Sequence, residues 1–197
     1  MKNRAAATAA ITLTALLALA GCASTTTGGG MDNMPGMGSS ASASPSADVN
    51  MADMQFTMMM IPHHEQAVEM ADMILGKDGI DERVLTLAEQ IKAAQGPEIE
   101  LMESWLDEWG TPMGDMGGMD HGGMMSDTDM QALEDATGAE ASRLFLEQMI
   151  VHHEGAIEMA QDEVDNGQNP DVITLAENII ASQTTEISTM EDILATL

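Results

Sequence analysis

The sequence predicts an all-α protein, a four-helix bundle made of a duplicated helical hairpin. The main observation is an internal repeat, because the block 56–71 returns at 145–160 and the block 85–91 returns at 173–179. Aromatic residues make up only 2% of the chain and Tyr is absent, which disfavours β-sandwiches and barrels. Two hairpins that each carry a half-exposed apolar stripe can bury those stripes only against each other. A bundle with pseudo-two-fold symmetry follows.

The N-terminal residues predict export and a lipid anchor. Two basic residues precede an apolar, uncharged run over 5–20, as in a secretory signal peptide. The run ends in Leu-Ala-Gly-Cys22, which resembles a bacterial lipobox, so we expect residues 1–21 to be removed and Cys22 to be lipidated. Residues 22–47 are rich in Ser, Thr, Gly and Met and predict a flexible tether. The expected location is extracytoplasmic, anchored to the cell membrane, or to the outer membrane facing the periplasm in a host that has one.

Residues 48–197 are expected to form the bundle, beginning with the first hairpin over 48–110. A break at Gly76 to Gly79 separates its two helices, and Gly96-Pro97 is expected to kink the second of them. Residues 111–125 are a Met- and Gly-rich loop.

The remainder, 126–197, is expected to hold a short helix and the second hairpin. Ser126 opens the short helix with a Ser-Asp-Thr-Asp capping box, and the helix stops near Gly138. A long helix from about 139 to 165 follows. The break at 166–170 ends in a proline suited to a first helical turn. We expect no strands.

Each repeat places two histidines on and beside its apolar stripe. At 100° per residue, Met60, Ala67 and Met70 lie within about 60° of His63, whereas His64 lies about 100° away. His63 should therefore point into the bundle and His64 toward a neighbouring helix, and the second copy repeats the pattern. A lone histidine would favour a satisfied core imidazole, but two His-His pairs flanked by Met favour metal ligation. The predicted bundle ligands are His63, His64, His152, His153, Met60, Met70, Met149 and Met159.

The partner helices add polar residues to their own apolar stripes, with Gln95 and Glu98 on one and Gln183 and Glu186 on the other. A Glu on a core stripe is costly unless it is paired. We expect Glu98 and Glu186 to approach the histidines, either as acceptors that fix a tautomer or as ligands. The alternative is a frayed or kinked helix in which both reach solvent. The two copies differ where the second has Gln148 and Glu163 in place of Met59 and Ile74.

The loop carries its own candidate ligands. A segment so rich in glycine is not expected to form a helix or to pack in a core, so packing does not explain its Met side chains. Met-x-x-Met spacing lets several sulfurs converge on one ion, and thioether sulfur selects Cu(I), while imidazole also suits Cu(II). The alternative is low-complexity disorder with incidental Met. The candidate loop ligands are Met113, Met116, Met119, His121, Met124 and Met125, and Met31, Met34 and Met37 repeat the spacing in the tether.

Charge and cysteine content disfavour or exclude several other classes. Six Lys and Arg against 33 Asp and Glu give a net charge of −27, which disfavours nucleic acid as a partner and docking on an anionic membrane through a basic patch. A single Cys permits neither a disulfide within the chain nor a thiolate metal site.

The two Met-x-x-His-His-Glu-x-Ala-x-Glu-Met blocks, with the Leu-Ala-Glu and Gln-x-x-Glu-Ile segments after them, resemble the domain-of-unknown-function family 305 over about 48–197. The resemblance implies a ferritin-like four-helix domain, found in bacterial exported proteins, with copper binding and tolerance in some members. It implies no established catalysis.

The favoured function is an extracytoplasmic copper-binding lipoprotein that buffers, sequesters or transfers copper. One alternative is a Cu(I) oxidase that uses the bundle core. Di-iron chemistry is disfavoured because the chain has no Glu-x-x-His motif. Another alternative is a structural or partner-binding bundle without metal. The partners considered are copper, a copper donor or acceptor protein, a second copy of the chain, and the membrane through the lipid anchor alone.

Overall fold

A computed structural model describes residues 48–111 and 122–197. These ranges contain five α-helices and no strand: α1 (Met51–Leu75), α2 (Glu82–Glu108), α3 (Asp127–Asp135), α4 (Gly138–Asn166) and α5 (Pro170–Leu194). The predicted all-α bundle of two hairpins is confirmed. Several predicted features lie outside the described residues: the signal peptide, Cys22, the tether with Met31, Met34 and Met37, and the loop residues Met113, Met116, Met119 and His121.

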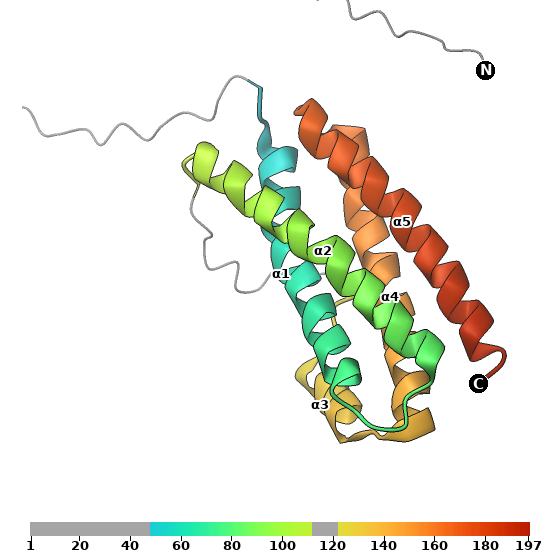
Figure 1. Cartoon of the computed structure of the whole chain (residues 1–197). Coiled ribbons are helices and arrows are strands. Elements are labelled where there is room, and N and C mark those ends of the chain that lie inside the picture. Colours follow the sequence, from blue (N-terminus) through green and yellow to red (C-terminus); the bar gives the residue numbers. More distant parts are fainter. Residues whose placement is uncertain (1–47, 112–121) are drawn as a thin grey trace, which may run out of the picture. The chain divides into compact units, whose positions relative to one another are not determined.

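The two hairpins join through α1 and α4. α1 packs mainly against α2, α4 mainly against α5, and α1 also packs against α4 (Figure 1). These two central helices are antiparallel, because Asn50 before α1 donates from Nδ2 to the backbone oxygen of Asn166 at the end of α4 (2.8 Å). We call this the open end of the bundle. α3 packs on α1 and α4 at the opposite end, which we call the capped end.

Capping boxes start two of the helices. The Ser126 hydroxyl accepts from the Asp129 backbone and the Asp129 carboxylate accepts from the Ser126 backbone, as the sequence predicts for α3. Asn50 and Asp53 do the same for α1. The buried Asp53 carboxylate also accepts from the backbone N–H groups of Gln168 (3.0 Å) and Asn169 (2.8 Å). The start of α1 is thereby fastened to the turn between α4 and α5.

α2 runs as one helix from Glu82 to Glu108 with Pro97 inside it. Proline lacks an N–H, so one hydrogen bond of the helical ladder is missing there. The helix nevertheless keeps one buried face along its length, and Gln95 and Met102 lie on that face on either side of the proline. The second helix of the predicted hairpin is therefore continuous.

Two apolar clusters lie at the two ends of the bundle. The cluster at the capped end contains Met70, Leu133 and Phe145, and the cluster at the open end contains Phe56 and Trp109. A layer of buried polar side chains lies between them, half-way along the helices. Its members are His63, His64, Gln95, His152, His153 and Gln183.

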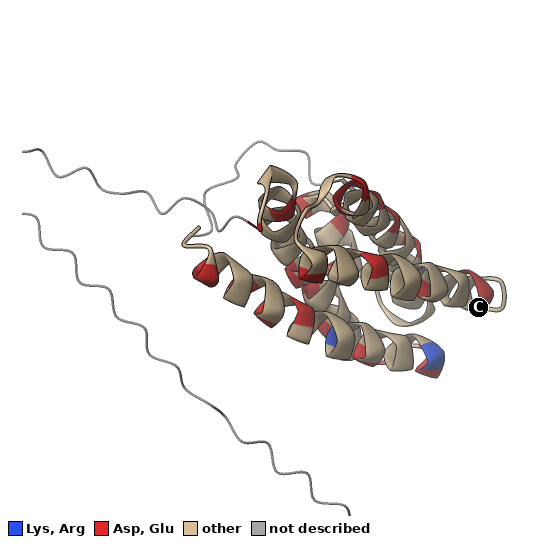
Figure 2. Ribbon diagram, turned by 90° about the horizontal axis from the view of Figure 1, so that it is seen from above, with Lys and Arg blue, Asp and Glu red and all other residues tan. Residues whose placement is uncertain are grey.

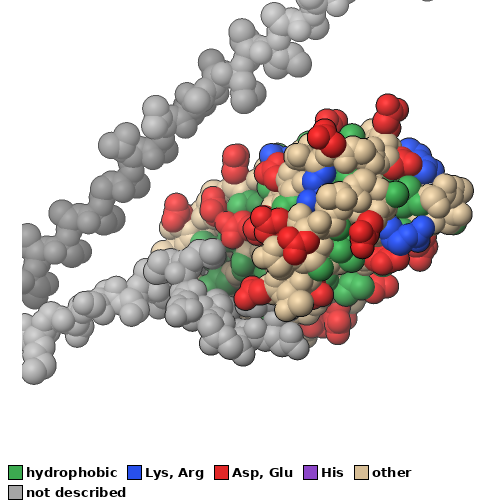
Figure 3. Space-filling model, turned by 90° about the horizontal axis from the view of Figure 1, so that it is seen from below, with side chains coloured by type: hydrophobic (Ala, Val, Ile, Leu, Met, Phe, Trp, Pro, Cys, Tyr) green, Lys and Arg blue, Asp and Glu red, His purple; other side chains and the backbone are tan. Residues whose placement is uncertain are grey.

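The surface is acidic on every long helix (Figure 2). On the face shown in Figure 3, the few basic side chains lie among carboxylates and apolar side chains. No helix within residues 48–111 and 122–197 combines the length and the apolar character that a membrane crossing requires.

Candidate metal site

The centre of the polar layer is a pair of imidazoles, one from each central helix. The rings of His63 on α1 and His152 on α4 have centroids 3.8 Å apart and planes tilted by 41°. Both residues are fully buried, as are their neighbours His64 and His153. The repeat thus brings together four histidines that the sequence separates into two pairs.

His64 and His153 each face a glutamate of the partner helix. His64 Nε2 lies 2.8 Å from Glu98 Oε2 on α2, and His153 Nε2 lies 2.6 Å from Glu186 Oε2 on α5. Both Glu side chains are mostly buried, at 24% and 19% exposure, so neither turns out to solvent. An ionised carboxylate can only accept, so Nε2 carries a hydrogen, and when the imidazole is neutral Nδ1 carries the lone pair. The Nδ1 atoms of His64 and His153 make no hydrogen bond within the described part of the chain.

His152 is held as a neutral imidazole. Burial lowers its pKa well below the usual range, and the neighbouring imidazoles of His63, His153 and His64 lower it further. Within the described ranges, neither ring nitrogen of His152 makes a hydrogen bond of ordinary geometry. A buried imidazole without a proton-bearing partner offers a lone pair, which is the property that a metal ligand needs.

The predicted methionine ligands lie at different distances along the helices. Met60 and Met149 each precede the central histidine by three residues, about one turn, and both are fully buried. Met70 and Met159 follow it by seven residues, about 10 Å of helix axis. Met70 is buried in the capped-end cluster, whereas Met159 is half-buried at the open end. Met60 and Met149 are therefore the thioethers nearest in sequence to the central imidazoles.

The described end of the Met-rich loop lies at the imidazole pair. The carbonyl oxygen of Gly122 is 3.2 Å from His63 Nε2. Met125 is held by Gln66 of α1, which donates to its backbone oxygen (2.9 Å) and accepts from its backbone N–H (2.7 Å). Met124 and Met125 are themselves half-buried. The sequence had indicated neither Gln66 nor Gly122, and the available signal was that Gln66 aligns with a glycine, Gly155, in the second copy.

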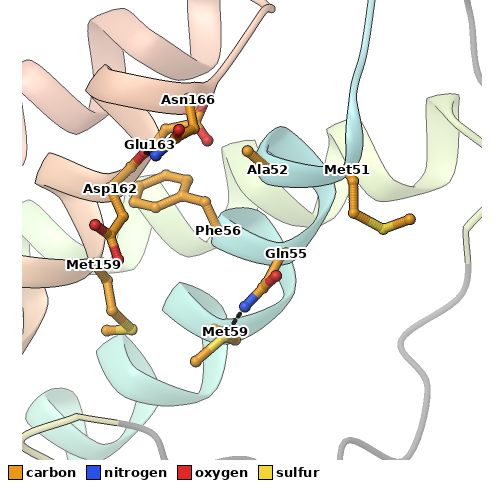
Figure 4. Close-up of a pocket in the computed structure, with 9 residues that line it drawn as sticks. All are labelled: Met51, Ala52, Gln55, Phe56, Met59, Met159, Asp162, Glu163 and Asn166. Atoms are coloured by element: carbon orange, nitrogen blue, oxygen red, sulfur yellow. Dashed lines mark hydrogen bonds between the residues drawn. The ribbon is translucent and has the colours of Figure 1, made fainter.

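A cavity of about 430 Å³ opens elsewhere, at the open end between α1 and α4 (Figure 4). Phe56, Met59, Met159 and Glu163 are among its lining residues. Glu163 is 1% exposed, and its burial, with the Asp53 carboxyl next to it, raises its pKa to about 8. None of the four histidines lines the cavity, and its nearest lining residue on α1, Met59, precedes His63 by about one helical turn.

No set of three or more His, Cys, Asp or Glu side chains in residues 48–111 and 122–197 is arranged to hold a metal ion. The histidines instead form two His–Glu pairs around a His–His pair. Gln95 on α2 and Gln183 on α5 are the other buried polar side chains of the layer. Within the described residues their Oε1 atoms have no hydrogen-bond partner. Among the described residues, the Nδ1 atoms of His64 and His153 and the Oε1 atoms of Gln95 and Gln183 are therefore buried acceptors without a hydrogen-bond donor.

The comparisons with known proteins agree on the family. The model of the DUF305 family (domain of unknown function) matches residues 53–194. A DUF305 fragment from Deinococcus radiodurans is 32% identical, with a TM-score of 0.69, over 76% of this chain and 99% of that one. A DUF305 protein from Streptomyces coelicolor that is named as secreted is 34% identical, also with a TM-score of 0.69, over 73% and 92%.

A protein called CopM is also similar, and several of its solved structures hold metal. CopM in the Cu(II)-bound form is 34% identical with a TM-score of 0.64, over 73% of this chain and 95% of that one. CopM structures in Cu(I)- and Ag-bound forms also match. No curated protein matches the chain. The family model covers most of the chain and two relatives agree with it over nearly their full length, so the chain belongs to the DUF305 family.

Proposed function

We propose that this protein binds copper outside the cytoplasm and buffers, sequesters or transfers it. The observation that carries the proposal is the buried layer of four imidazoles. His152 in that layer is neutral and makes no hydrogen bond of ordinary geometry within the described residues. Imidazole nitrogen and thioether sulfur suit copper in both of its common oxidation states. The likeness to CopM, which is known in Cu(I)- and Cu(II)-bound forms, supports the same cargo.

The residues present fit such a cargo. Glu98 and Glu186 would orient His64 and His153 and raise their basicity, as carboxylates do for metal-bound histidines elsewhere. Met60 and Met149 would add soft sulfur one turn from the central pair. The full proposed set remains His63, His64, His152, His153, Met60, Met70, Met149 and Met159 in the bundle, with Met113, Met116, Met119, His121, Met124 and Met125 in the loop.

The location forms part of the proposal. The Leu-Ala-Gly-Cys22 sequence supports lipidation at Cys22, and a relative named as secreted supports export. Mass spectrometry of the membrane fraction would find a lipid-modified N-terminal Cys22 peptide. A Cys22→Ser variant should lose that lipid and leave the membrane fraction. Unmodified Cys22 in the wild-type protein would contradict the anchor without affecting the copper proposal.

The copper proposal is tested by anaerobic Cu(I) titration of residues 23–197, which keep every described residue, against a chromophoric chelator. The test variant is His63→Gln with His152→Gln, which keeps buried polar side chains but removes the central imidazoles. The control is Gln148→Ala, which alters a buried side chain of α4 one turn away. A second variant replaces Met113, Met116, Met119, Met124 and Met125 with Ser.

We expect the histidine variant to lose at least about tenfold in Cu(I) affinity, while circular dichroism shows an intact helical fold. The Gln148 control should bind as the wild type does. Loss confined to the methionine variant would move the principal site into the loop. A wild-type protein that does not compete with the chelator would overturn the copper proposal.

A further inference from the structure

Residues 122–125, which we call the strap, run across both central helices at the imidazole pair. At one end the strap lies on α4, where a Cβ on Gly155 would overlap the carbonyl oxygen of Gly122 and lie 2.7 Å from Gly123 Cα. At the other end Met125 is held on α1 by the two hydrogen bonds of Gln66. At the α4 end, the carbonyl oxygen of Gly122 also lies 3.2 Å from His63 Nε2 on α1.

Gln66 and Gly155 occupy the same position of the repeat, directly after each His-His-Glu. A glycine in the interior of a helix costs about 1 kcal/mol of stability relative to alanine. Gly155 has a structural reason, because only a residue without Cβ lets the strap backbone come so close to α4. Gly123 has φ +81° and packs against the Gly155 backbone in return. The two copies thus have different residues at one equivalent position, and each of these residues helps to hold the strap in place.

The strap also favours one tautomer of neutral His63. A carbonyl oxygen only accepts hydrogen bonds, so the contact with Gly122 requires the hydrogen of neutral His63 to be on Nε2. A metal ion that approached Nε2 would have to displace the Gly122 carbonyl. Seating of the strap and access to this nitrogen are therefore mutually exclusive.

We propose that Gln66 and Gly155 are positioning residues that seat the strap on His63, and that release of the strap controls how fast metal exchanges with the imidazole pair. The proposal rests on the proposed copper function. It goes further by naming a backbone segment that competes with the cargo and the two side-chain positions that hold this segment.

The experiment uses Gly155→Ala, which drives the strap off α4, and Gln66→Ala, which removes the clamp without adding bulk. The matched controls are Gly76→Ala, whose new Cβ would meet nothing closer than 3.5 Å, and Gln90→Ala on the exposed face of α2. Two readouts are taken. NMR of ¹⁵N-labelled histidine gives the His63 tautomer without metal, and stopped-flow transfer of Cu(I) to a chromophoric chelator gives the exchange rate.

We expect both test variants to lose the fixed Nε2–H tautomer of His63. Their Cu(I) exchange should be at least about fivefold faster, the factor that corresponds to one lost hydrogen bond. Both controls should match the wild type. An unchanged tautomer in both test variants would overturn the seating roles. A lost tautomer with exchange within twofold of wild type would overturn the control of exchange. Absence of Cu(I) binding in every protein would instead overturn the proposed function, while the tautomer still tests the seating.

Discussion

The two hairpins match at the histidines and at the glutamates that face them, and they differ at several positions around these residues. His63 and His152 occupy equivalent positions, and the two His–Glu pairs are equivalent as well. Several aligned positions of the two histidine-bearing helices differ, and three of them have a visible structural role: Met59 against Gln148, Gln66 against Gly155, and Ile74 against Glu163. The repeated residues therefore build the imidazole layer, and the unmatched residues fit each hairpin to its own surroundings.

Two of these differences, Met59 against Gln148 and Ile74 against Glu163, accompany the presence of a single α3. At the capped end Gln148 donates to the backbone oxygen of Asp129 (2.9 Å) and fastens α3, and Ile74 is buried in the apolar cluster beneath it. At the open end the equivalent residues, Met59 and Glu163, line a cavity. A duplicated hairpin that gains one extra helix must become asymmetric wherever that helix packs.

The largest loss of stability is expected when Ile74 at the capped end is replaced by Glu, the residue found at the equivalent position at the open end. Ile74→Glu places a carboxyl among apolar side chains that offer it no partner, and should cost roughly 4 kcal/mol of unfolding free energy. Urea unfolding measures it. The converse change, Glu163→Ile, should not destabilise the protein. A loss below about 1 kcal/mol for Ile74→Glu would show that the capped end is more open than the structure has it.

An intermediate loss of stability is expected at the two His–Glu pairs, where the two copies have the same residues. Glu98→Ala and Glu186→Ala each remove the acceptor of a buried imidazole N–H and should cost roughly 2 kcal/mol in urea unfolding. Because the pairs are equivalent, the two losses should agree within about 0.5 kcal/mol. Glu100→Ala, on the exposed side of α2, serves as the control and should change stability by less than about 0.5 kcal/mol. Clearly unequal losses would contradict the symmetry of the polar layer.

The central layer was predictable from the sequence because helical periodicity and a repeat determine which side chains share a face. The stripe around His63 is buried as predicted, and Glu98 and Glu186 contact the outer histidine of each pair. The capping box of α3 was predictable for the same reason, since its partners lie three residues apart.

The strap was not predictable in this way. Its position on α1 and α4 depends on the path of a glycine-rich segment across these two helices. The helical periodicity of the sequence carries no information about such a path. A missing side chain at Gly155 becomes meaningful only when a backbone is seen to fill its place. The fastening of α1 to the distant Gln168 and Asn169 through Asp53 is likewise a long-range contact without a local signal.

A further effect, which appears only as the pH rises, is the pH dependence that Glu163 gives to the open end. Its pKa is about 8 in the folded protein against 4.5 for an ordinary glutamate. Between these values the folded state binds more protons than the unfolded state, so stability falls as the pH rises. Its companion in the first hairpin, Ile74, contributes no such dependence.

The pH effect is measured as the melting temperature between pH 5 and pH 9. Glu163→Gln removes the titration, so the variant should melt roughly 10 °C above the wild type at pH 9 and close to it at pH 5. Asp162→Asn, on the exposed neighbour, is the control. A wild-type melting temperature that rises relative to Glu163→Gln as the pH rises would contradict the buried position of Glu163.

The central claim, that copper binds at the imidazole layer, is tested most directly by NMR of ¹⁵N-histidine protein during anaerobic addition of Cu(I). Cu(I) is diamagnetic, so each ring nitrogen can be followed, and His121 provides a comparison within the same sample. The account predicts that ring nitrogens of His63, His64, His152 and His153 shift with the first equivalent. Shifts confined to His121, or no histidine shift at all, would contradict it.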